Sequence, residues 1–505
     1  MHAFLVMALA QSEAPPAACA AAMNAFCNGD PAMAGCLAEI AAANGTLPLV
    51  ALRDTDAGGG ARSWRCYSPS CLDASRARYV AGKGCKLYCS HDAELSAILS
   101  AGCASTLLFE NGANATACFR IPNVIAIGAA NATTTTLLAF AEARRKSCSD
   151  KGPKSLAMRR SLDGGSSWEP TRFLVSDAAA ASDGLNLGAS VVDARSGTVF
   201  VHYGVCGHSC RPHGSTFILS SADRGATWAK ADITAMVAAA GWGMINAGPG
   251  TGVQLPWGGG GGGGPPQYPG RMAVAVWGRR LETPAEAEGG VAALLSDDGG
   301  ATWRLSAAPV LATPAHAPNE CQLAALANGS LLMNVRDARA NGCKCRLFTR
   351  SDDGGETWTA LREQPALTGP VCQGSMISVN DTGGASGGGG SSSSSSMPLF
   401  YSAPQSLEAR EDGYIKASVD GGASWWLRGD RLDSAAEPGF GYSGLVDLGA
   451  AATAASGASG ASAAGGAAAA AAPPPPHVRQ LGVIYEPGGG GIEFKTVSVD
   501  YSDIL

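Results

Sequence analysis

A few arginines and one glutamate of this chain stand in contexts that could support chemistry. Arg120 lies in a Phe-Arg-Ile-Pro motif just before a predicted strand, and Glu320 in Asn-Glu-Cys-Gln precedes Arg336 by sixteen residues, a separation that suits two adjacent strands. Arginine stays charged and presents a planar fork of donors, so converging arginines can grip a small anion through paired hydrogen bonds. The net charge is −6 and there is no run of lysine or arginine. Any anion must therefore be bound by a few such side chains.

The elements that must position these residues are indicated by an internal repeat. The pattern Ser-x-Asp-x-Gly-x-Ser/Thr-Trp occurs at 161–168, 221–228, 296–303, 351–358 and 418–425. Its aspartates are separated by 60, 75, 55 and 67 residues, which matches one four-stranded blade with loops of variable length. The spacing therefore predicts an all-β propeller.

The chemistry of the repeat is that of a hairpin turn. An Asp side chain bonds nearby backbone N–H groups, Gly supplies positive φ without steric cost, and the Trp packs under the turn. The repeat resembles the Asp box. The Asp-Gly-Gly segment also resembles part of a calcium loop, but the other ligands of such a loop are absent from the sequence. We therefore expect these aspartates to be structural, neither catalytic nor metal-binding.

The overall composition agrees with many short strands. Hydrophobic residues make up 46% of the 505 residues and charged residues 15%, with 68 Gly and 28 Pro, which favours short elements joined by turns over long amphipathic helices. The thinly spread charge argues against nucleic acid as a partner. No segment offers eighteen uninterrupted apolar residues, so we expect no membrane span.

The first hundred residues lack the repeat and differ in composition. Eight of the sixteen cysteines lie between Cys19 and Cys103, which favours a disulfide framework in an oxidising compartment. Free buried thiols are one alternative. Zinc is another, because Cys66, Cys71, Cys85 and Cys89 form two pairs, although their spacing is loose and His91 stands alone.

These features suggest a domain division and a compartment. Residues 1–10 resemble a short signal peptide, residues 11–104 form a cysteine-rich domain or cap, and residues 105–505 form the propeller, with low-complexity loops at 258–266, 383–396 and 450–476. Glycosylation sequons agree with export and predict a secreted or lumenal protein; they begin at Asn44, Asn114, Asn131, Asn328 and Asn380.

Together with the Asp boxes, the Phe-Arg-Ile-Pro motif resembles the sialidase (neuraminidase) superfamily, and the motifs follow the family order from about Cys118 to the C-terminus. The resemblance implies a six-bladed β-propeller and a glycoside hydrolase that removes terminal sialic acids from glycoconjugates, without cofactor or metal. The family's three arginines, which bind the sugar carboxylate, match Arg120, Arg336 and Arg410. Its glutamate that supports the first arginine matches Glu486.

The resemblance also implies an unusual nucleophile. Most glycosidases use two carboxylates, whereas sialidases use a tyrosine, and the match is Tyr442 in Gly-Tyr-Ser. A neutral phenol avoids repulsion by the carboxylate of the sugar, but its usual pKa of about 10 requires a base, for which Glu320 is the candidate. The general acid precedes the first Asp box in the family, and Asp150 is the best match. Arg144 belongs to a nearby Glu-Ala-Arg segment where the family more often has Glu-Gly-Arg.

Other functions are compatible with the same repeats, because a fold does not determine an activity. A non-catalytic Asp-box receptor would keep the turns without the arginines. A lectin-like pseudoenzyme would keep the arginines without the acid. A hydrolase or transferase for a related ulosonic acid would keep both. The ordered set of arginines, glutamates and tyrosine favours a retaining sialidase with an acidic pH optimum.

Overall fold

The computed structural model describes twelve stretches of the chain. They are residues 50–55, 61–67, 105–128, 135–177, 184–205, 214–256, 268–281, 289–339, 342–379, 397–433, 438–450 and 477–505. The chain divides into two units, 1–106 and 107–505. In the first unit, β1 (Val50–Thr55) and β2 (Ala61–Tyr67) form an antiparallel pair.

Several sequence predictions concern residues beyond these stretches. The candidate signal peptide at 1–10, the loops at 258–266 and 383–396, and residues 451–476 of the third loop lie outside the described residues. So do the sequons at Asn44, Asn131 and Asn380. Of the N-terminal cysteines, Cys66 falls in β2 and the others lie outside the described part of the chain, so the zinc and disulfide alternatives there remain predictions.

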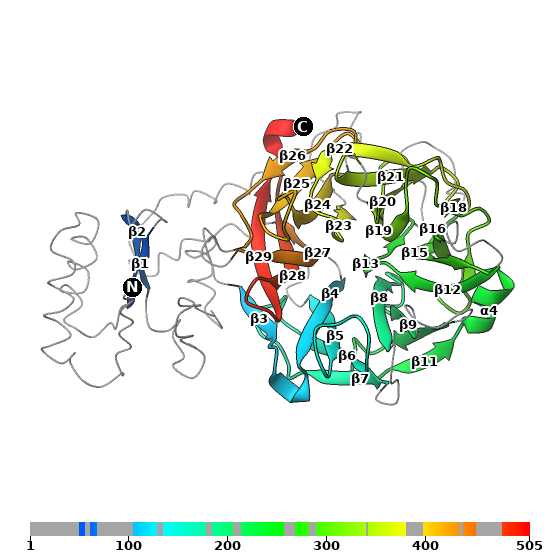
Figure 1. The fold of residues 1–505 in the computed structure, drawn as a ribbon, viewed down its shortest axis with the longest axis horizontal. Coiled ribbons are helices and arrows are strands. Elements are labelled where there is room, and N and C mark those ends of the chain that lie inside the picture. The colour runs from blue at the N-terminus through cyan, green and yellow to red at the C-terminus, as the bar shows by residue number, and fades with distance from the viewer. Residues whose placement is uncertain are drawn as a thin grey trace, which may run out of the picture. The chain divides into compact units, whose positions relative to one another are not determined.

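The described residues of the second unit form the predicted six-bladed β-propeller, with six mainly antiparallel sheets arranged around a central axis (Figure 1). Blade 1 is β4 (Cys118–Ile127), β5 (Thr136–Arg144), β6 (Lys154–Ser161) and β7 (Arg172–Ser176). Blade 2 is β8 (Leu185–Val192), β9 (Val199–Val205), β10 (Ser215–Ser221) and β11 (Ala229–Asp232), with β13 (Gly250–Thr251) added parallel to β8. Blade 3 is β12 (Trp242–Ala247), β15 (Met272–Arg280), β16 (Gly289–Ser296) and β17 (Arg304–Leu305), with β14 (Val253–Gln254) and β18 (Val310–Leu311) at its side.

The second half of the ring has the same construction. Blade 4 is β19 (Pro318–Ala325), β20 (Leu331–Asp337), β21 (Cys345–Ser351) and β22 (Arg362–Thr368). Blade 5 is β23 (Ser375–Ser378), β24 (Leu399–Pro404), β25 (Gly413–Ser418) and β26 (Trp426–Arg428). Blade 6 is β27 (Phe440–Ala450), β28 (Val478–Pro487), β29 (Ile492–Asp500) and β3 (Thr106–Phe109).

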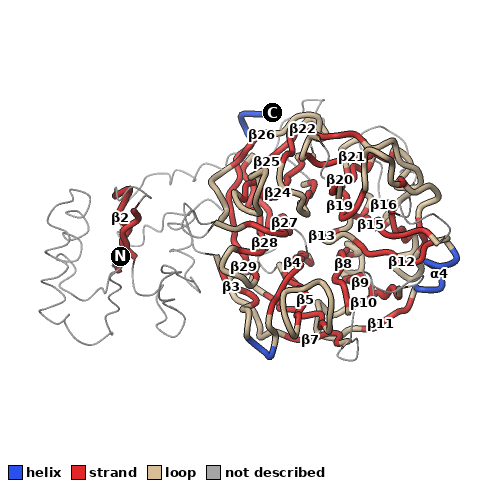
Figure 2. The backbone as a smooth tube through the Cα atoms, in the orientation of Figure 1, coloured by secondary structure: helices blue, strands red, loops and turns tan. Residues whose placement is uncertain are grey.

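Helix is scarce in the described residues, as Figure 2 shows. The helical segments are α4 (Thr234–Ala239) and the 3₁₀ turns η2 (Ala113–Ala115) and η3 (Ser502–Ile504). Within the described stretches, no helix has the length and apolar character to cross a bilayer.

Ring closure explains why six blades carry five Asp boxes. In blades 1 to 5 the box forms the turn between the third and fourth strands, as 161–168 does between β6 and β7. In blade 6 the fourth strand is β3, which comes from the other end of the chain, so no turn joins it to β29. The chain thereby closes its ring with strands from both ends of the second unit.

Each Asp box bonds its own backbone and also packs on the preceding blade. In the first box, Asp163 Oδ1 accepts hydrogen bonds from the Ser161 hydroxyl and the Ser167 N–H, each at 2.8 Å. The Trp168 ring packs edge-on against Phe494 of blade 6, with centroids 5.3 Å apart. A Cβ on Gly165 would lie 2.8 Å from that same phenylalanine, so glycine is required there. The repeat thus joins neighbouring blades as well as closing a hairpin.

Candidate active site

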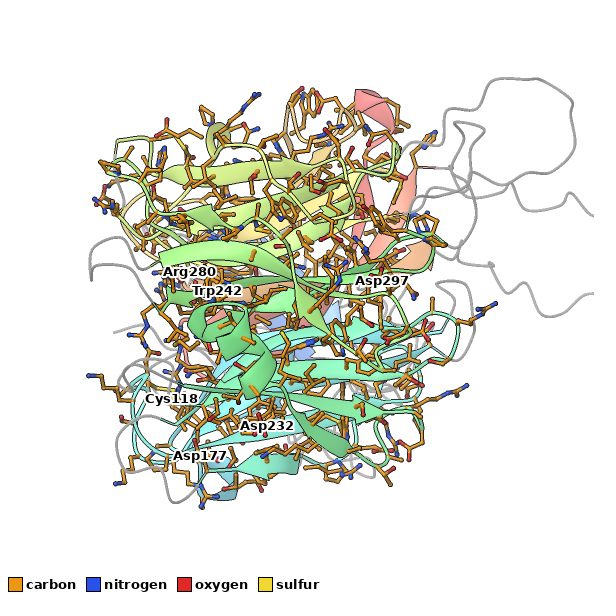
Figure 3. All side chains as sticks on the ribbon, turned by 90° about the vertical axis from the view of Figure 1, so that its right-hand side faces the viewer. Cys118, Asp177, Asp232, Trp242, Arg280 and Asp297 are labelled. Atoms are coloured by element: carbon orange, nitrogen blue, oxygen red, sulfur yellow. A yellow bond between two sulfur atoms is a disulfide. The ribbon has the colours of Figure 1, made fainter. Side chains whose placement is uncertain are left out.

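The predicted site residues lie where strand ends meet at one edge of the blades. Arg120, Glu320 and Tyr442 lie near the starts of the first strands β4, β19 and β27, whereas Arg336 and Glu486 lie near the ends of the second strands β20 and β28. In an antiparallel pair these two ends are neighbours, so all five share one face of the ring. In Figure 3, Cys118 and Asp297 lie toward opposite faces. Cys118 begins β4 beside the site, whereas Asp297 belongs to an Asp box.

The centre of the site is a buried tyrosine bonded to a carboxylate. The Tyr442 hydroxyl donates to Glu320 Oε1 at 2.5 Å, and Arg336 Nη1 donates to Glu320 Oε2 at 2.6 Å and to Tyr442 Oη at 2.8 Å. Burial and the adjacent Glu320 carboxylate raise the pKa of Tyr442 well above its usual value. The tyrosine therefore rests as a phenol, with an acceptor for its proton already in hydrogen-bond contact.

A second ion pair fixes the first arginine. Glu486 accepts hydrogen bonds from Arg120 Nε at 3.0 Å and Arg120 Nη2 at 2.9 Å, a bidentate arrangement. The same carboxylate accepts from the Ile121 N–H at 2.9 Å and the Tyr442 N–H at 3.3 Å. Glu486 therefore holds together the starts of β4 and β27, which carry Arg120 and Tyr442.

Two further guanidinium groups stand beside the tyrosine ring. The Cζ atoms of Arg120 and Arg410 lie 5.1 and 5.3 Å from the centroid of Tyr442. Arg410 belongs to the loop between β24 and β25, and its carbonyl accepts the Phe440 N–H at 2.7 Å, which fixes the loop against β27. With Arg336 hydrogen-bonded to the phenol, three cations surround one side chain. Such a cluster can bind a carboxylate.

Two other arginines that follow Arg410 in the sequence do not share this arrangement. Arg428 pairs with Asp503 at 3.0 Å, and Arg431 pairs with Asp433 at 2.7 Å and with Asp412 at 2.6 Å. The structure thus brings Arg410, of these three, to the tyrosine.

Asp150 lies on the exposed loop between β5 and β6. Its Oδ1 atom is 2.8 Å from Arg144 Nη1 and 3.7 Å from Arg120 Nη1, and 59% of its side chain is exposed. Arg144 is buried and is itself oriented by Glu142, which accepts from its Nε and Nη2 atoms at 3.0 and 2.8 Å. A carboxyl group thus borders the arginine cluster from the solvent side.

Comparison with known proteins identifies the family. The model of the BNR repeat-like domain matches residues 135–452, which is more than half of the chain. The chain belongs to the sialidase family of BNR-repeat propellers. It is 26% identical over 336 residues to a sialidase of Bacteroides fragilis, covering 62% of this chain and 55% of that protein. It is 30% identical over 300 residues to human sialidase-4, covering 54% of this chain and 56% of that protein. This sialidase-family chain thus spans about half the length of these relatives.

Solved structures share the fold at lower identity. A Hadza microbial sialidase superposes with a TM-score of 0.60 at 22% identity, covering 80% of this chain and 69% of that one. The intramolecular trans-sialidase of Ruminococcus gnavus superposes with a TM-score of 0.53 at 15% identity, covering 78% of this chain and 97% of that one. At these identities the likeness concerns the propeller fold.

Sequence reasoning missed two residues that organise this sialidase-family site. Asp433 accepts hydrogen bonds from the N–H groups of Asp412 at 3.2 Å, Gly413 at 2.8 Å and Gly439 at 2.9 Å. It therefore links the Arg410 loop to the strand that carries Tyr442. No repeat or motif marks Asp433, and besides Arg431 its hydrogen-bond partners are these backbone N–H groups.

The second missed residue is Arg346, which is buried behind Glu320. Its guanidinium donates to Asn334 Oδ1 at 2.6 Å, to the Cys372 carbonyl at 2.7 Å and to the Glu320 carbonyl at 3.5 Å. Burial lowers the pKa of Arg346 from its usual value. Its position in the Cys-Lys-Cys-Arg segment gave no sign of this role, since a single arginine in a strand is most often exposed.

In the described stretches, one group of side chains has metal-ligand spacing, namely Cys343, Cys345 and Glu363. The two cysteines are joined as a disulfide, so their sulfur atoms are not available as thiolate ligands.

Proposed function

We propose that the protein is a retaining exo-α-sialidase that hydrolyses terminal sialic acids of oligosaccharides, glycoproteins or glycolipids. The observation that carries the proposal is the contact between Tyr442 and Glu320, shared with Arg336, at the centre of three arginines. A tyrosine in hydrogen-bond contact with a base can lose its proton as it attacks. It is suited to attack at a centre that already bears an anionic group.

Substrate binding rests on the arginines. The carboxylate of a sialic acid is attached to the anomeric carbon and stays ionised at any working pH. Arg120, Arg336 and Arg410 would bind it through charge-assisted hydrogen bonds. Because Glu486 already orients Arg120, little ordering of that side chain is required when the sugar enters.

The first chemical step forms a tyrosyl glycoside. The Tyr442 oxygen attacks the anomeric carbon while its proton passes to Glu320, and the bond from that carbon to the leaving oxygen breaks as Asp150 protonates the oxygen. The raised pKa of Tyr442 keeps the phenol neutral until the attack, so that no second anion faces the sugar carboxylate beforehand.

The second step releases the sugar. The Asp150 carboxylate takes a proton from a water molecule, whose oxygen attacks the anomeric carbon from the side that the leaving group vacated. The tyrosyl oxygen departs and recovers its proton from Glu320. Two displacements at one carbon give net retention, and both side chains return to their starting protonation states.

A secreted or lumenal location is part of the proposal. Two disulfides in the described residues support it, Cys118–Cys148 and Cys343–Cys345, because disulfides persist mainly in oxidising compartments.

The proposal is tested by release of fluorophore from the 4-methylumbelliferyl α-glycoside of N-acetylneuraminate between pH 4 and 7. We expect activity with an acidic optimum, abolished in Tyr442→Phe and Arg120→Ala. Tyr268→Phe is the matched control, because this tyrosine packs on Arg271, 3.5 Å from its guanidinium carbon, outside the site. A folded protein inactive on this glycoside and on deaminated or eight-carbon analogues contradicts the proposal and favours a binding protein. A flat profile up to pH 9 contradicts the role of Asp150.

A further inference from the structure

A disulfide connects the strand of the first arginine with the loop of the candidate acid. Cys118 lies two residues before Arg120, at the start of β4, and Cys148 lies two residues before Asp150. The two cysteines are bonded, with their Cα atoms 5.1 Å apart, and stand 30 positions apart in the sequence. The covalent bond therefore joins the start of β4 to the loop that follows its neighbour β5, within blade 1.

The loop that carries Asp150 cannot be held by hydrophobic burial. Residues 145–152 read Arg-Lys-Ser-Cys-Ser-Asp-Lys-Gly and contain no large apolar side chain, and residues 145–150 are exposed. At the base of the loop, the Arg145 N–H donates to the Pro153 carbonyl at 3.2 Å. Exposed loops with few apolar contacts open at little cost in free energy, so the position of the tip depends on its specific anchors.

One of those anchors is Arg144, whose hold on Asp150 depends on protonation. Arg144 Nη1 donates to the Cys148 carbonyl at 2.6 Å and lies 2.8 Å from Asp150 Oδ1. An ion pair to a carboxylate that is 59% exposed contributes little on its own. A general acid must also be protonated when it acts, and a neutral carboxyl group forms no ion pair with Arg144. The attraction between Arg144 and Asp150 is thus weakest when Asp150 carries the proton that it donates. The disulfide does not change with the protonation of Asp150.

We infer that the Cys118–Cys148 disulfide positions Asp150 for proton donation to the leaving group, and that its loss selectively impairs acid catalysis. The inference rests on the proposed function and assigns a role to two residues outside the arginine and tyrosine set. In it, Cys118 and Cys148 are positioning residues that act through Asp150. General acids contribute about 10²- to 10⁴-fold, and a displacement of about 1 Å can remove much of such a contribution.

The leaving group distinguishes this role from general structural support. A sugar hydroxyl is a poor leaving group and needs a proton as its bond breaks, whereas 4-methylumbelliferone leaves readily as a phenolate. A misplaced acid therefore slows cleavage of sialyllactose much more than cleavage of the fluorogenic glycoside. Damage to the arginines or to Tyr442 would slow both.

The test compares kcat/KM on these two substrates for wild type, Cys118→Ala/Cys148→Ala and the control Cys343→Ala/Cys345→Ala, which lacks the other described disulfide. We expect a loss of about tenfold or more on sialyllactose and of less than about threefold on the fluorogenic glycoside, in the first variant only. In an Asp150→Ala background the cysteine changes should cause no further loss. Equal losses on both substrates, unchanged kinetics, or full additivity with Asp150→Ala overturn the inference.

A second measurement covers the case in which the cysteine variant does not fold. Native wild-type protein is treated with dithiothreitol, which converts both sulfurs to thiols and is itself oxidised to a cyclic disulfide. Alkylation and mass spectrometry establish that Cys118 and Cys148 have been reduced while the circular dichroism spectrum is retained. The expected result is the same selective loss on sialyllactose, reversed on reoxidation; an unchanged ratio between the substrates overturns the inference. Wild-type activity on the fluorogenic glycoside tests the proposed function separately. If the wild-type protein is inactive, both the proposed function and the inference about the disulfide fail.

Discussion

Carboxylates serve two different purposes on the two faces of this propeller. In the Asp boxes the partners are local: Asp353 Oδ1 accepts from the Ser351 hydroxyl at 2.7 Å and from the Thr357 N–H at 2.9 Å, both within four residues. In the site the partners are distant, since Glu486 pairs with Arg120 across 366 residues and Glu320 with Tyr442 across 122. Local carboxylates stabilise a turn that the repeat already specifies. Distant ones join different blades, and the Glu486–Arg120 pair links blade 6 to blade 1.

This contrast predicts that the two classes fail differently when changed. Loss of a site carboxylate should remove activity with a small effect on stability. Loss of a box aspartate should lower stability with a small effect on activity.

Glu320→Gln should have the largest effect on activity. The amide keeps the shape of the side chain but cannot take the proton of Tyr442, so we expect kcat to fall about 10²- to 10⁴-fold. Hydrolysis of the fluorogenic sialoside, measured beside a thermal melt, checks this. Activity within a few-fold of wild type would show that Glu320 is not the base.

Glu486→Gln should weaken substrate binding. It replaces the charged bidentate partner of Arg120 by a neutral one, and hydrogen bonds to charged groups contribute about 1.5–3 kcal/mol, so kcat/KM should fall about 10- to 100-fold, mainly through KM. Glu169→Gln is the matched control, because Glu169 pairs with Arg160 through the same atoms at 3.0 and 2.9 Å, away from the site. Similar losses in both variants would contradict a role for Glu486 in binding.

Asp353→Ala should affect stability alone. Removing the acceptor of several turn hydrogen bonds should destabilise the fold by about 1–2 kcal/mol, seen as a lower melting temperature. The kcat/KM of the folded protein should stay within about twofold of wild type, because the box is remote from the site. Lost activity at unchanged stability would break the distinction between the two classes.

Acidification should have the mildest effect. Partial burial would raise the pKa of Asp353, but hydrogen bonds from Thr357 and Ser351 outweigh it and hold that pKa below its usual value. The net direction is the same for the other four box aspartates, Asp163, Asp223, Asp298 and Asp420. A folded-state pKa below the unfolded value of about 3.9 gives stability that is present above that pH and lost below it.

Melting temperature measured against pH checks this sign. From these carboxylates we expect no loss between about pH 5 and 7 and a decline below about pH 4, smaller in Asp353→Asn than in wild type. A variant that declines as steeply as wild type would show that the box carboxylate does not contribute.

The sequence allowed prediction of what is local and repeated. Five Asp boxes were readable because each turn is specified within eight residues, and the sixteen residues between Glu320 and Arg336 did indicate adjacent strands, β19 and β20. The pairing of β3 with β29, which closes the ring, was not predictable, because a four-residue strand far from its partner carries no periodic signal.

The candidate site was predictable only as far as the family resemblance extended. The resemblance named Arg120, Tyr442 and Glu486, and the structure places them in contact. It was silent about Asp433, which links the Arg410 loop to β27 by accepting hydrogen bonds from backbone N–H groups that any sequence supplies. It was equally silent about the Cys118–Cys148 bond, because pairing among sixteen cysteines cannot be deduced from their spacing.

The role of Tyr442 as the nucleophile is best tested by trapping the glycosyl-enzyme. A sialic acid with fluorine at both the anomeric carbon and its neighbour reacts because fluoride leaves readily, and the second fluorine slows hydrolysis of the product. We predict that mass spectrometry of the digested protein will find one fluorosialyl group, on the peptide that contains Tyr442, and none in Tyr442→Phe. An adduct on Glu320, Asp150 or another residue, or none in protein that cleaves sialosides, would show that Tyr442 is not the nucleophile.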